Sequence, residues 1–252
     1  MQALILAAGV GKRLMPLTEN QPKCMVEVNG ISLIENTLNH LANRNIDEVV
    51  IVVGYLKNKI IEKFGSNYKN MKITYVENEI YDTTNNVYSF YLAKDYIHDD
   101  VIMLESDLFY NRNLIDTMFL RKDDCDILVS PFNKETMDGS VIVVDKENVA
   151  KKLVIKRDQD ENFDYTDAFK TVNIYSFKKE FIINKLFPAI ETYVKTQSLN
   201  SYYELVIGSL IYFGNDNIKV IKTDDKNWCE IDDIDDLKRA ERTFKIGKNR
   251  NN

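Results

Sequence analysis

The chain has 252 residues, of which 44% are hydrophobic and 29% are charged, so we expect a single α/β domain with a full core. Its formal net charge of −6 argues against a nucleic acid as partner, because proteins that bind duplexes are usually basic. Three cysteines without metal-ligand spacing favour a reducing compartment, and no apolar stretch is long enough to cross a bilayer. We therefore expect a cytoplasmic protein without membrane insertion.

The first predicted element is a buried strand over residues 3–6, which leads into a loop with two glycines and two basic residues. Glycine allows the main chain to approach a ligand closely and to offer its N–H groups to anionic oxygens. Arg13 and Lys23 add fixed positive charge. Such a loop can hold a nucleoside triphosphate by its phosphates. The candidate binding residues in this segment are Leu6, Ala7, Ala8, Gly9, Gly11, Lys12, Arg13 and Lys23.

This loop differs from two well-known phosphate loops. A dinucleotide-binding fingerprint requires a third glycine, but this chain has Leu14 at that position. The Lys-Ser/Thr ending of a P-loop is also absent. The loop therefore argues against a dinucleotide-dependent oxidoreductase.

Predicted helices and strands alternate through the rest of the first half. Helices are expected over 31–41, 56–64 and 86–94, and strands over 48–53, 72–76 and 101–105. This alternation predicts a parallel, doubly wound sheet, in which ligands bind beyond the carboxyl ends of the strands. Because Gly9 and Asp107 both follow such strands, they should face one crevice.

The second half is expected to be more mixed. Strands are predicted over 127–131, 140–144, 149–155, 171–177 and 218–222. Helices are predicted over 181–196, broken or kinked at Pro188, and over 202–213, and a last helix is capped by Asp233. We predict one domain over 1–247, with a nucleotide-binding half to about residue 125, an acceptor-binding half to about 247, and a polar tail over 248–252.

Residues 6–23 as a whole match the pattern LAAG-x-G-x-R-x-x-P-x-T followed by Pro-Lys. This pattern resembles the signature of the nucleotidyltransferase family, and the resemblance extends over nearly the whole chain. It implies a single-domain, Rossmann-like α/β fold with a mostly parallel central sheet flanked by helices, and a smaller mixed part that binds the acceptor. The implied reaction joins an acceptor oxyanion to the α-phosphorus of a nucleoside triphosphate and releases pyrophosphate.

The resemblance also suggests roles for the basic residues. Arg13 is expected to hold the β- and γ-phosphates, and Lys23 to be the main catalytic cation at the α-phosphate and the acceptor oxygen. A phosphate or phosphonate acceptor is already ionised, so no general base is required. The chain has only two histidines, which agrees with this chemistry.

Two aspartates are candidate ligands for Mg²⁺, which prefers carboxylates together with phosphate oxygens. Asp107 and Asp232 match the two metal-binding aspartates of the family. Without the resemblance, Asp107 is equally a turn residue and Asp232 a helix cap. Asp233 and Asp235 are close enough in sequence to compete with Asp232 for the metal role.

The segment 81–89 bears on the choice of substrate. The chain has no glycine between Ser66 and Gly139, whereas sugar nucleotidyltransferases usually carry a glycine-rich segment here. The Asn-Asn-x-Tyr-Ser sequence instead resembles cytidylyltransferases that activate phosphocholine or 2-aminoethylphosphonate. Asn85, Asn86 and Ser89 are therefore expected to bind the nucleotide, since amides can read a pyrimidine edge. The alternative is that the asparagines cap a helix.

Candidate acceptor-binding residues lie in the second half. Lys170 is in a segment that resembles the acceptor strand of 2-aminoethylphosphonate enzymes and is expected to bind the phosphonate. Carboxylates and aromatic rings that suit an ammonium group are supplied by Tyr203, Glu204, Trp228, Glu230 and Asp138. In the alternative interpretation Lys170 is a solvated strand end and the tyrosines belong to the core.

These observations predict a Mg²⁺-dependent enzyme that transfers CMP from CTP to a small amine-bearing phosphonate or phosphate, with 2-aminoethylphosphonate preferred. Phosphocholine, phosphoethanolamine and sugar 1-phosphates are alternative acceptors. A catalytically silent nucleotide-binding regulatory protein is the alternative outside the enzyme class, because a fold alone does not establish chemistry.

Overall fold

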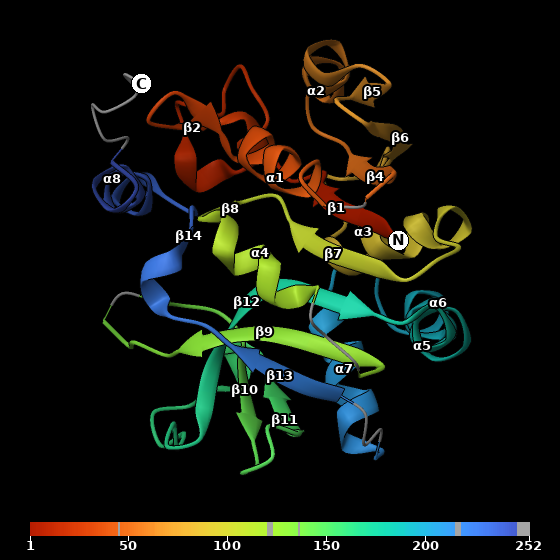
Figure 1. The fold of residues 1–252 in the computed structure, drawn as a ribbon. Helices are drawn as coiled ribbons and strands as arrows, with labels where there is room; N and C mark the ends of the chain where they lie inside the picture. The colour runs from red at the N-terminus through yellow and green to blue at the C-terminus, as the bar shows by residue number, and fades with distance from the viewer. Residues whose placement is uncertain (45, 120–122, 136, 215–217, 246–252) are drawn as a thin grey trace.

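The computed structural model describes residues 1–44, 46–119, 123–135, 137–214 and 218–245 (Figure 1). The centre of its main sheet consists of four parallel strands in the order β7 (Val101–Glu105), β1 (Gln2–Ala7), β4 (Glu48–Val53) and β6 (Met71–Glu77). The predicted alternation is therefore confirmed for this half. Because the strands are parallel, the residues that follow them gather at one edge of the sheet.

The two faces of this sheet are covered by different helices, as the alternating residues of β1 show. Leu4 and Leu6 pack in one core cluster, and Ala3, Ile5 and Ala7 pack in another. The first cluster includes α3 (Asn86–Leu92), α5 (Lys179–Phe181), α6 (Phe187–Thr196) and α7 (Tyr203–Tyr212). The second includes α1 (Leu33–Leu41), α2 (Lys57–Phe64) and α4 (Arg112–Met118).

The second half extends the sheet with mainly antiparallel strands. β12 (Ala168–Phe177) pairs antiparallel with β7 and joins the two halves. Around it lie β9 (Cys125–Pro131), β10 (Val141–Val144), β11 (Ala150–Val154) and β13 (Ile218–Lys222). Figure 1 shows these green and blue strands together, below the red and yellow N-terminal half. The predicted mixed part is thus confirmed.

Several short elements escaped the sequence analysis, since two or three residues carry no readable periodicity. They are the strands β2 (Glu27–Val28), β3 (Ile31–Ser32), β5 (Asn67–Tyr68), β8 (Leu108–Tyr110) and β14 (Trp228–Glu230). The helix expected from residue 31 begins only at Leu33, because Ile31 and Ser32 pair with β2. The pairing of β8 with β14 matters most, since it connects distant parts of the chain.

The break expected at Pro188 takes the form of a change of helix type beside this residue and not of an end of the helix. The chain stays helical through this residue, which lies in the first turn of α6. The irregularity comes just before it, as a π-helical turn over Ile182–Leu186.

The last helix, α8 (Ile234–Thr243), returns to the N-terminal half and lies beside β2 (Figure 1). Asp233 caps it as predicted, and its side chain accepts hydrogen bonds from the main chain of Asp235 and Asp236. The predicted polar tail over 248–252 lies outside the described residues, and the division at about residue 125 stays a prediction. Among the described helices, none has both the length and the apolar character needed to cross a membrane.

Candidate active site

A cavity of about 970 Å³ opens where the carboxyl ends of the parallel strands meet the second half. Its size is within the range of small-molecule sites. Most of the predicted site residues line it: Leu6, Ala8, Gly9, Gly11, Lys12, Arg13, Lys23, Asn85, Asn86, Ser89, Asp107, Asp138, Lys170, Glu204, Glu230 and Asp232. The fold therefore brings the candidate nucleotide-binding and acceptor-binding residues to one place.

Three predicted site residues do not line the cavity. The side chain of Ala7 packs in the core, and Tyr203 is 0% exposed. The Tyr203 hydroxyl donates a hydrogen bond to Glu105 Oε1 at 2.8 Å, so this residue supports a lining carboxylate from behind. Trp228 is also buried, with Lys170 Nζ at 5.9 Å from the centre of its ring. The structure therefore does not place Ala7, Tyr203 and Trp228 where direct contact with a ligand was expected.

The glycine loop is shaped around Lys23. Gly11 has a positive φ of 69°, and a Cβ there would lie 2.8 Å from Lys23 Cβ, so only glycine permits this approach. Thr18 fixes the loop by donating from Oγ1 to the Gly11 carbonyl oxygen at 2.9 Å. Arg13 extends from the loop with 65% of its side chain exposed. The loop thus presents main-chain groups and one accessible guanidinium group to the cavity.

Lys23 lies between the two predicted metal-binding aspartates. Its Nζ is 2.8 Å from Asp107 Oδ2 and 2.7 Å from Asp232 Oδ1, and Arg13 Nη2 is 2.9 Å from the same Asp232 oxygen. Burial alone would lower the pKa of Lys23, but the two carboxylates outweigh it and raise that pKa. Burial likewise opposes ionisation of Asp232, yet Lys23 and Arg13 lower its pKa. Lys23 and Asp232 are therefore both charged at neutral pH.

The pairing of β8 with β14 explains why the aspartates meet. Glu230 pairs with Leu108, and the Ile231 N–H donates to the Asp107 carbonyl oxygen at 2.9 Å. The cap at Asp233 then starts α8 directly after Asp232. Two segments that are far apart in the sequence thus place their acidic residues side by side.

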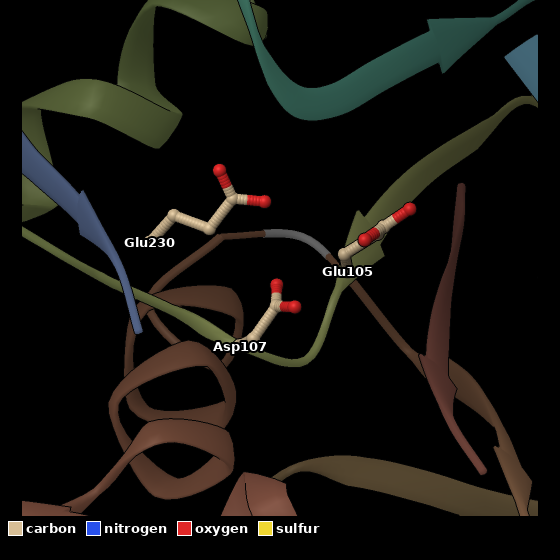
Figure 2. Close-up of side chains that lie close together, drawn as sticks. All are labelled: Glu105, Asp107 and Glu230. Atoms are coloured by element: carbon tan, nitrogen blue, oxygen red, sulfur yellow. The ribbon is translucent and has the colours of Figure 1, made fainter. Parts of the chain in front are cut away.

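A group of three carboxylates fits a divalent cation. Glu105, Asp107 and Glu230 each offer an oxygen, and these atoms lie within 4.8 Å of one another (Figure 2). Asp107 Oδ1 is buried and has no hydrogen-bond partner among the residues that the structure describes. Such oxygen ligands suit Mg²⁺. The group differs from the predicted pair, because it contains Asp107 but not Asp232.

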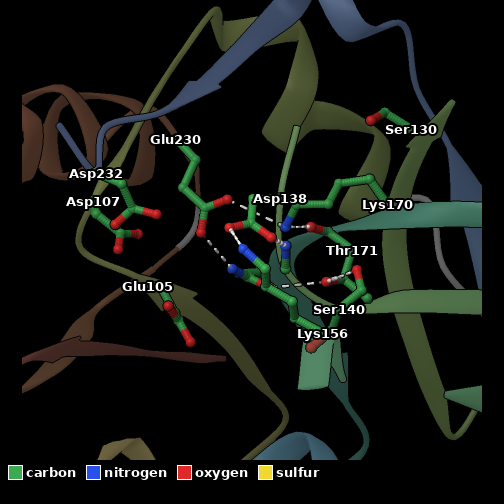
Figure 3. A network of polar contacts seen from close by, with 12 residues as sticks. Glu105, Asp107, Ser130, Asp138, Ser140, Lys156, Lys170, Thr171, Glu230 and Asp232 are labelled. Atoms are coloured by element: carbon green, nitrogen blue, oxygen red, sulfur yellow. Dashed lines mark hydrogen bonds and ion pairs between the residues drawn. The ribbon is translucent and has the colours of Figure 1, made fainter. Parts of the chain in front are cut away.

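The second half contributes most of what we call the carboxylate end of the cavity, which consists of Glu105 from β7 together with Ser140, Lys170, Asn173, Glu204 and Glu230. Lys170 is 2% exposed; its Nζ lies 3.2 Å from Glu230 Oε2 and donates to the Thr171 carbonyl oxygen at 2.9 Å (Figure 3). It is therefore a buried ion-pair partner and not a solvated strand end. Gly139 lies against it, since a Cβ there would be 3.1 Å from Nζ.

The carboxylates of this end are held individually. Asn173, at a positive φ of 60°, donates from Nδ2 to Glu230 Oε1 at 3.1 Å. The buried Glu204 accepts from Ser140 Oγ at 3.4 Å and from Asn86 Nδ2 at 3.5 Å. Neutral donors thus orient Glu204, and one neutral donor orients Glu230 in addition to its ion pair with Lys170.

Burial and mutual repulsion act together on these acids. Burial, and then the charges of Asp107 and Glu204, raise the pKa of Glu105 well above its usual range. Burial raises the pKa of Glu230 to about 7, although Lys170 opposes the shift. A bound cation would relieve this repulsion, so the carboxylate end is complementary to positive charge.

The two asparagines have structural partners. Asn85 caps α3, and its side-chain oxygen accepts from the Asn86 N–H at 2.8 Å. Asn86 accepts from the Tyr203 N–H at 3.1 Å and donates to Glu105 at 3.1 Å. Asn86 therefore links the two halves of the molecule, and the capping alternative holds for Asn85.

The sequence analysis missed several lining residues: Asn78, Tyr81, Thr84, Glu105, Ser106, Ser140, Ile155, Lys156, Arg157, Asn173 and Asn200. A repeated spacing could have revealed one of them, because Glu105-Ser-Asp107 and Glu230-Ile-Asp232 share a Glu-x-Asp pattern. Lys156 forms an ion pair with Asp138, which also lines the cavity (Figure 3). The others carry no comparable signal in a single sequence.

Comparison with known proteins identifies relatives over the full chain. The family model described as nucleotidyl transferase matches residues 2–245. A CMP-5'-(3-aminopropyl)phosphonate synthase from Streptomyces rubellomurinus is 31% identical over 97% of this chain, which spans only 39% of the length of that relative. A CTP:phosphoglutamine cytidylyltransferase from Campylobacter jejuni is 28% identical over 94% of this chain and 98% of its own length.

A solved structure of a CTP:phosphocholine cytidylyltransferase from Streptococcus pneumoniae superposes with a TM-score of 0.74 at 23% identity. The match covers 96% of this chain and 97% of the other, which confirms the predicted fold. Because the family model covers nearly all residues, the chain belongs to the nucleotidyl transferase family of enzymes.

Proposed function

We propose that this enzyme transfers CMP from CTP to a small phosphonate or phosphate that bears an amine, and that 2-aminoethylphosphonate is its preferred acceptor. The observation that carries this proposal is the carboxylate end, where Glu105, Glu204 and Glu230 surround the space beside Lys170. Such a surface favours a cationic acceptor over a neutral sugar. The names of the two full-chain relatives, an aminopropylphosphonate synthase and a phosphoglutamine cytidylyltransferase, support the same class of reaction.

The proposed reaction is an in-line displacement at the α-phosphorus. An ionised acceptor oxygen forms the new bond, while the bond to the bridging oxygen of pyrophosphate breaks and its electron pair leaves with that group. Gly9, Gly11 and Arg13 would hold the triphosphate, and Lys23 would neutralise charge between the α-phosphate and the acceptor. The proton balance requires no base, because the acceptor oxygen carries no proton.

We propose Mg²⁺ as the cofactor, held by Asp107 together with Asp232. Asp107 Oδ1, for which the described part of the chain offers no hydrogen-bond partner, supports this assignment. When bound, the ion would neutralise and orient phosphate oxygens. Lys23 lies between Asp107 and Asp232 and offsets part of their negative charge.

The type of amine follows from the groups that line the cavity. A quaternary ammonium cannot donate hydrogen bonds and needs an aromatic surround, whereas a primary ammonium needs acceptors. The aromatic side chains among the described lining residues are Tyr81 and Tyr202, while Trp228 is buried and does not line the cavity. Carboxylates predominate near Lys170, and we therefore favour a primary amine over choline.

The test is pyrophosphate release with CTP and Mg²⁺ against 2-aminoethylphosphonate, phosphoethanolamine, phosphocholine and glucose 1-phosphate. The proposal predicts fastest release with 2-aminoethylphosphonate, and much slower release when UTP replaces CTP. Fastest release with phosphocholine would overturn the preference for a primary amine. Release only with glucose 1-phosphate would overturn the proposed substrate class.

A further inference from the structure

The cavity has a second end, which we call the neutral end and define by Asn78, Tyr81, Thr84 and Ser89. Asn78 follows β6 whereas Asp107 follows β7, and β1 and β4 lie between these strands in the sheet. The lining side chains of this end carry no formal charge. Under the proposed function, on which this inference rests, the phosphates lie near Lys23 and the nucleobase lies at the neutral end.

Main-chain groups fix the orientation of the Asn78 amide, which is 1% exposed. The Ile80 N–H, which can only donate, is 3.2 Å from Asn78 Oδ1. The amide nitrogen must therefore face the other way, where it donates to Thr84 Oγ1 at 3.0 Å and to Ser89 Oγ at 3.2 Å. Both hydrogens of the amide are thus used.

The two hydroxyl groups that receive these hydrogen bonds differ in what they can still do. The Thr84 hydroxyl donates its hydrogen to the Ile80 carbonyl oxygen at 2.8 Å. The Ser89 hydroxyl accepts from Asn78, and no acceptor for its own hydrogen lies within reach among the described residues of the protein. Ser89 is 4% exposed and lines the cavity. Ser89 therefore presents a hydrogen-bond donor to a ligand.

A donor in this place distinguishes the two common pyrimidines. Ring nitrogen N3 of cytosine accepts a hydrogen bond, whereas N3 of uracil carries a hydrogen and can only donate. We infer that Asn78 is a positioning residue, which makes Ser89 an obligatory donor to N3 and thereby selects CTP over UTP. Asn78 itself contacts no base in this arrangement, since all its hydrogen-bonding groups have protein partners.

Asn78→Asp inverts this arrangement without changing the shape of the side chain. At a pH where the new carboxyl group is ionised, one of its oxygens still accepts from Ile80 and the other can only accept, so the Ser89 hydroxyl turns and donates to it. The lone pairs of Ser89 then face N3 and suit uracil. We expect the affinity ratio of CTP to UTP to fall by about tenfold or more, with tighter binding of UTP, because a mispaired buried polar group is costly.

The experiment is calorimetric titration of Mg²⁺-CTP and Mg²⁺-UTP into the wild type and matched variants. Ser89→Ala removes the donor directly and should abolish most of the preference for CTP. In the double variant, Asn78→Asp should cause no further fall in the affinity ratio of CTP to UTP. Ser209→Ala is the control, since it also removes a serine hydroxyl, which donates to the Leu205 carbonyl oxygen at 2.8 Å on α7 and does not line the cavity; its CTP-to-UTP ratio should equal that of the wild type.

Equal weakening of both nucleotides by Asn78→Asp, or an unchanged preference in Ser89→Ala, would overturn the inference. Asn78→Ala introduces no charge and provides a second route if the aspartate variant does not fold. It should lower the preference for CTP without tighter binding of UTP, and an unchanged ratio would again contradict the role of Asn78. A wild type that binds UTP as well as CTP would instead contradict the proposed function.

Discussion

The neutral end and the carboxylate end of the cavity are built in different ways. At the neutral end, one short segment supplies every group, and main-chain atoms fix the orientation of Asn78. At the carboxylate end, the groups come from distant strands and helices, as in the bond from Asn86 to Glu204 across 118 positions. The local sequence therefore determines how the side chains of the neutral end are arranged, whereas those of the carboxylate end come together only in the complete fold.

This difference predicts different responses to substitution. A change at the neutral end alters hydrogen bonds between uncharged groups and leaves no buried charge without a partner. A change at the carboxylate end leaves a buried charge without its partner, as when Lys170 or Glu230 is removed. Four substitutions test this contrast and the chemistry between the two ends.

The largest effect is expected for Lys23→Ala, between the two ends. Loss of this ammonium group should lower kcat by about 100- to 1000-fold, the usual cost of one preorganised charge-stabilising donor. Steady-state pyrophosphate release measures it, with circular dichroism as the check on folding. Lys63→Ala is the matched control. The ammonium group of Lys63 lies 3.0 Å from the Glu35 carboxylate, and Lys63 does not line the cavity. Near wild-type turnover in a folded Lys23→Ala variant would contradict the catalytic role.

Asp107→Asn should weaken the response to Mg²⁺, because it removes an anionic oxygen from the carboxylate group. We expect the half-maximal Mg²⁺ concentration to rise by about tenfold or more. Asp235→Asn is the control, since its side chain is 90% exposed and pairs with Lys238 at 3.3 Å. Titration of activity with MgCl₂ checks both variants, and identical curves for Asp107→Asn and the wild type would refute the metal assignment.

Glu204→Gln tests the carboxylate end. Removal of this charge should raise KM for 2-aminoethylphosphonate by about tenfold, the typical value of one hydrogen bond to a charged group. The KM for ethylphosphonate, which lacks the amine, should not change. Glu191→Gln provides the control, because Glu191 pairs on the surface with Lys94 at 3.0 Å. An equal rise in KM for both acceptors would show that Glu204 does not recognise the amine.

The smallest effect concerns the cap that positions Asp232. Asp233→Ala removes the capping side chain of α8 and should lower the free energy of unfolding by about 1 kcal/mol. Urea denaturation measures this change. Asp235→Ala, next to the cap, should have almost no effect, and equal losses in the two variants would contradict the capping role.

The sequence could predict what depends on local patterns. The alternation of helices and strands, the glycine loop around Gly11 and the cap at Asp233 follow from spacing and residue type. The inward direction of Tyr203 and Trp228 does not, because it depends on how α7 and β14 pack against the rest of the fold.

The acidic residues show the same limit. Asp107 could be located at a strand end, but its approach to Glu230 depends on the register of β8 with β14. A three-residue strand leaves no periodic pattern, so this pairing could not be predicted. The positive φ of Asn173, which aims its amide at Glu230, is likewise set by the irregular pairing of β12.

The central claim is that the two ends of the cavity select independently, one for the base and the other for the amine. The most direct test is kcat/KM for all four combinations of CTP or UTP with 2-aminoethylphosphonate or ethylphosphonate. The account predicts that CTP with 2-aminoethylphosphonate is best, and that the two preferences multiply. Equal values for the amine and its deaminated analogue, or a preference for UTP, would contradict it.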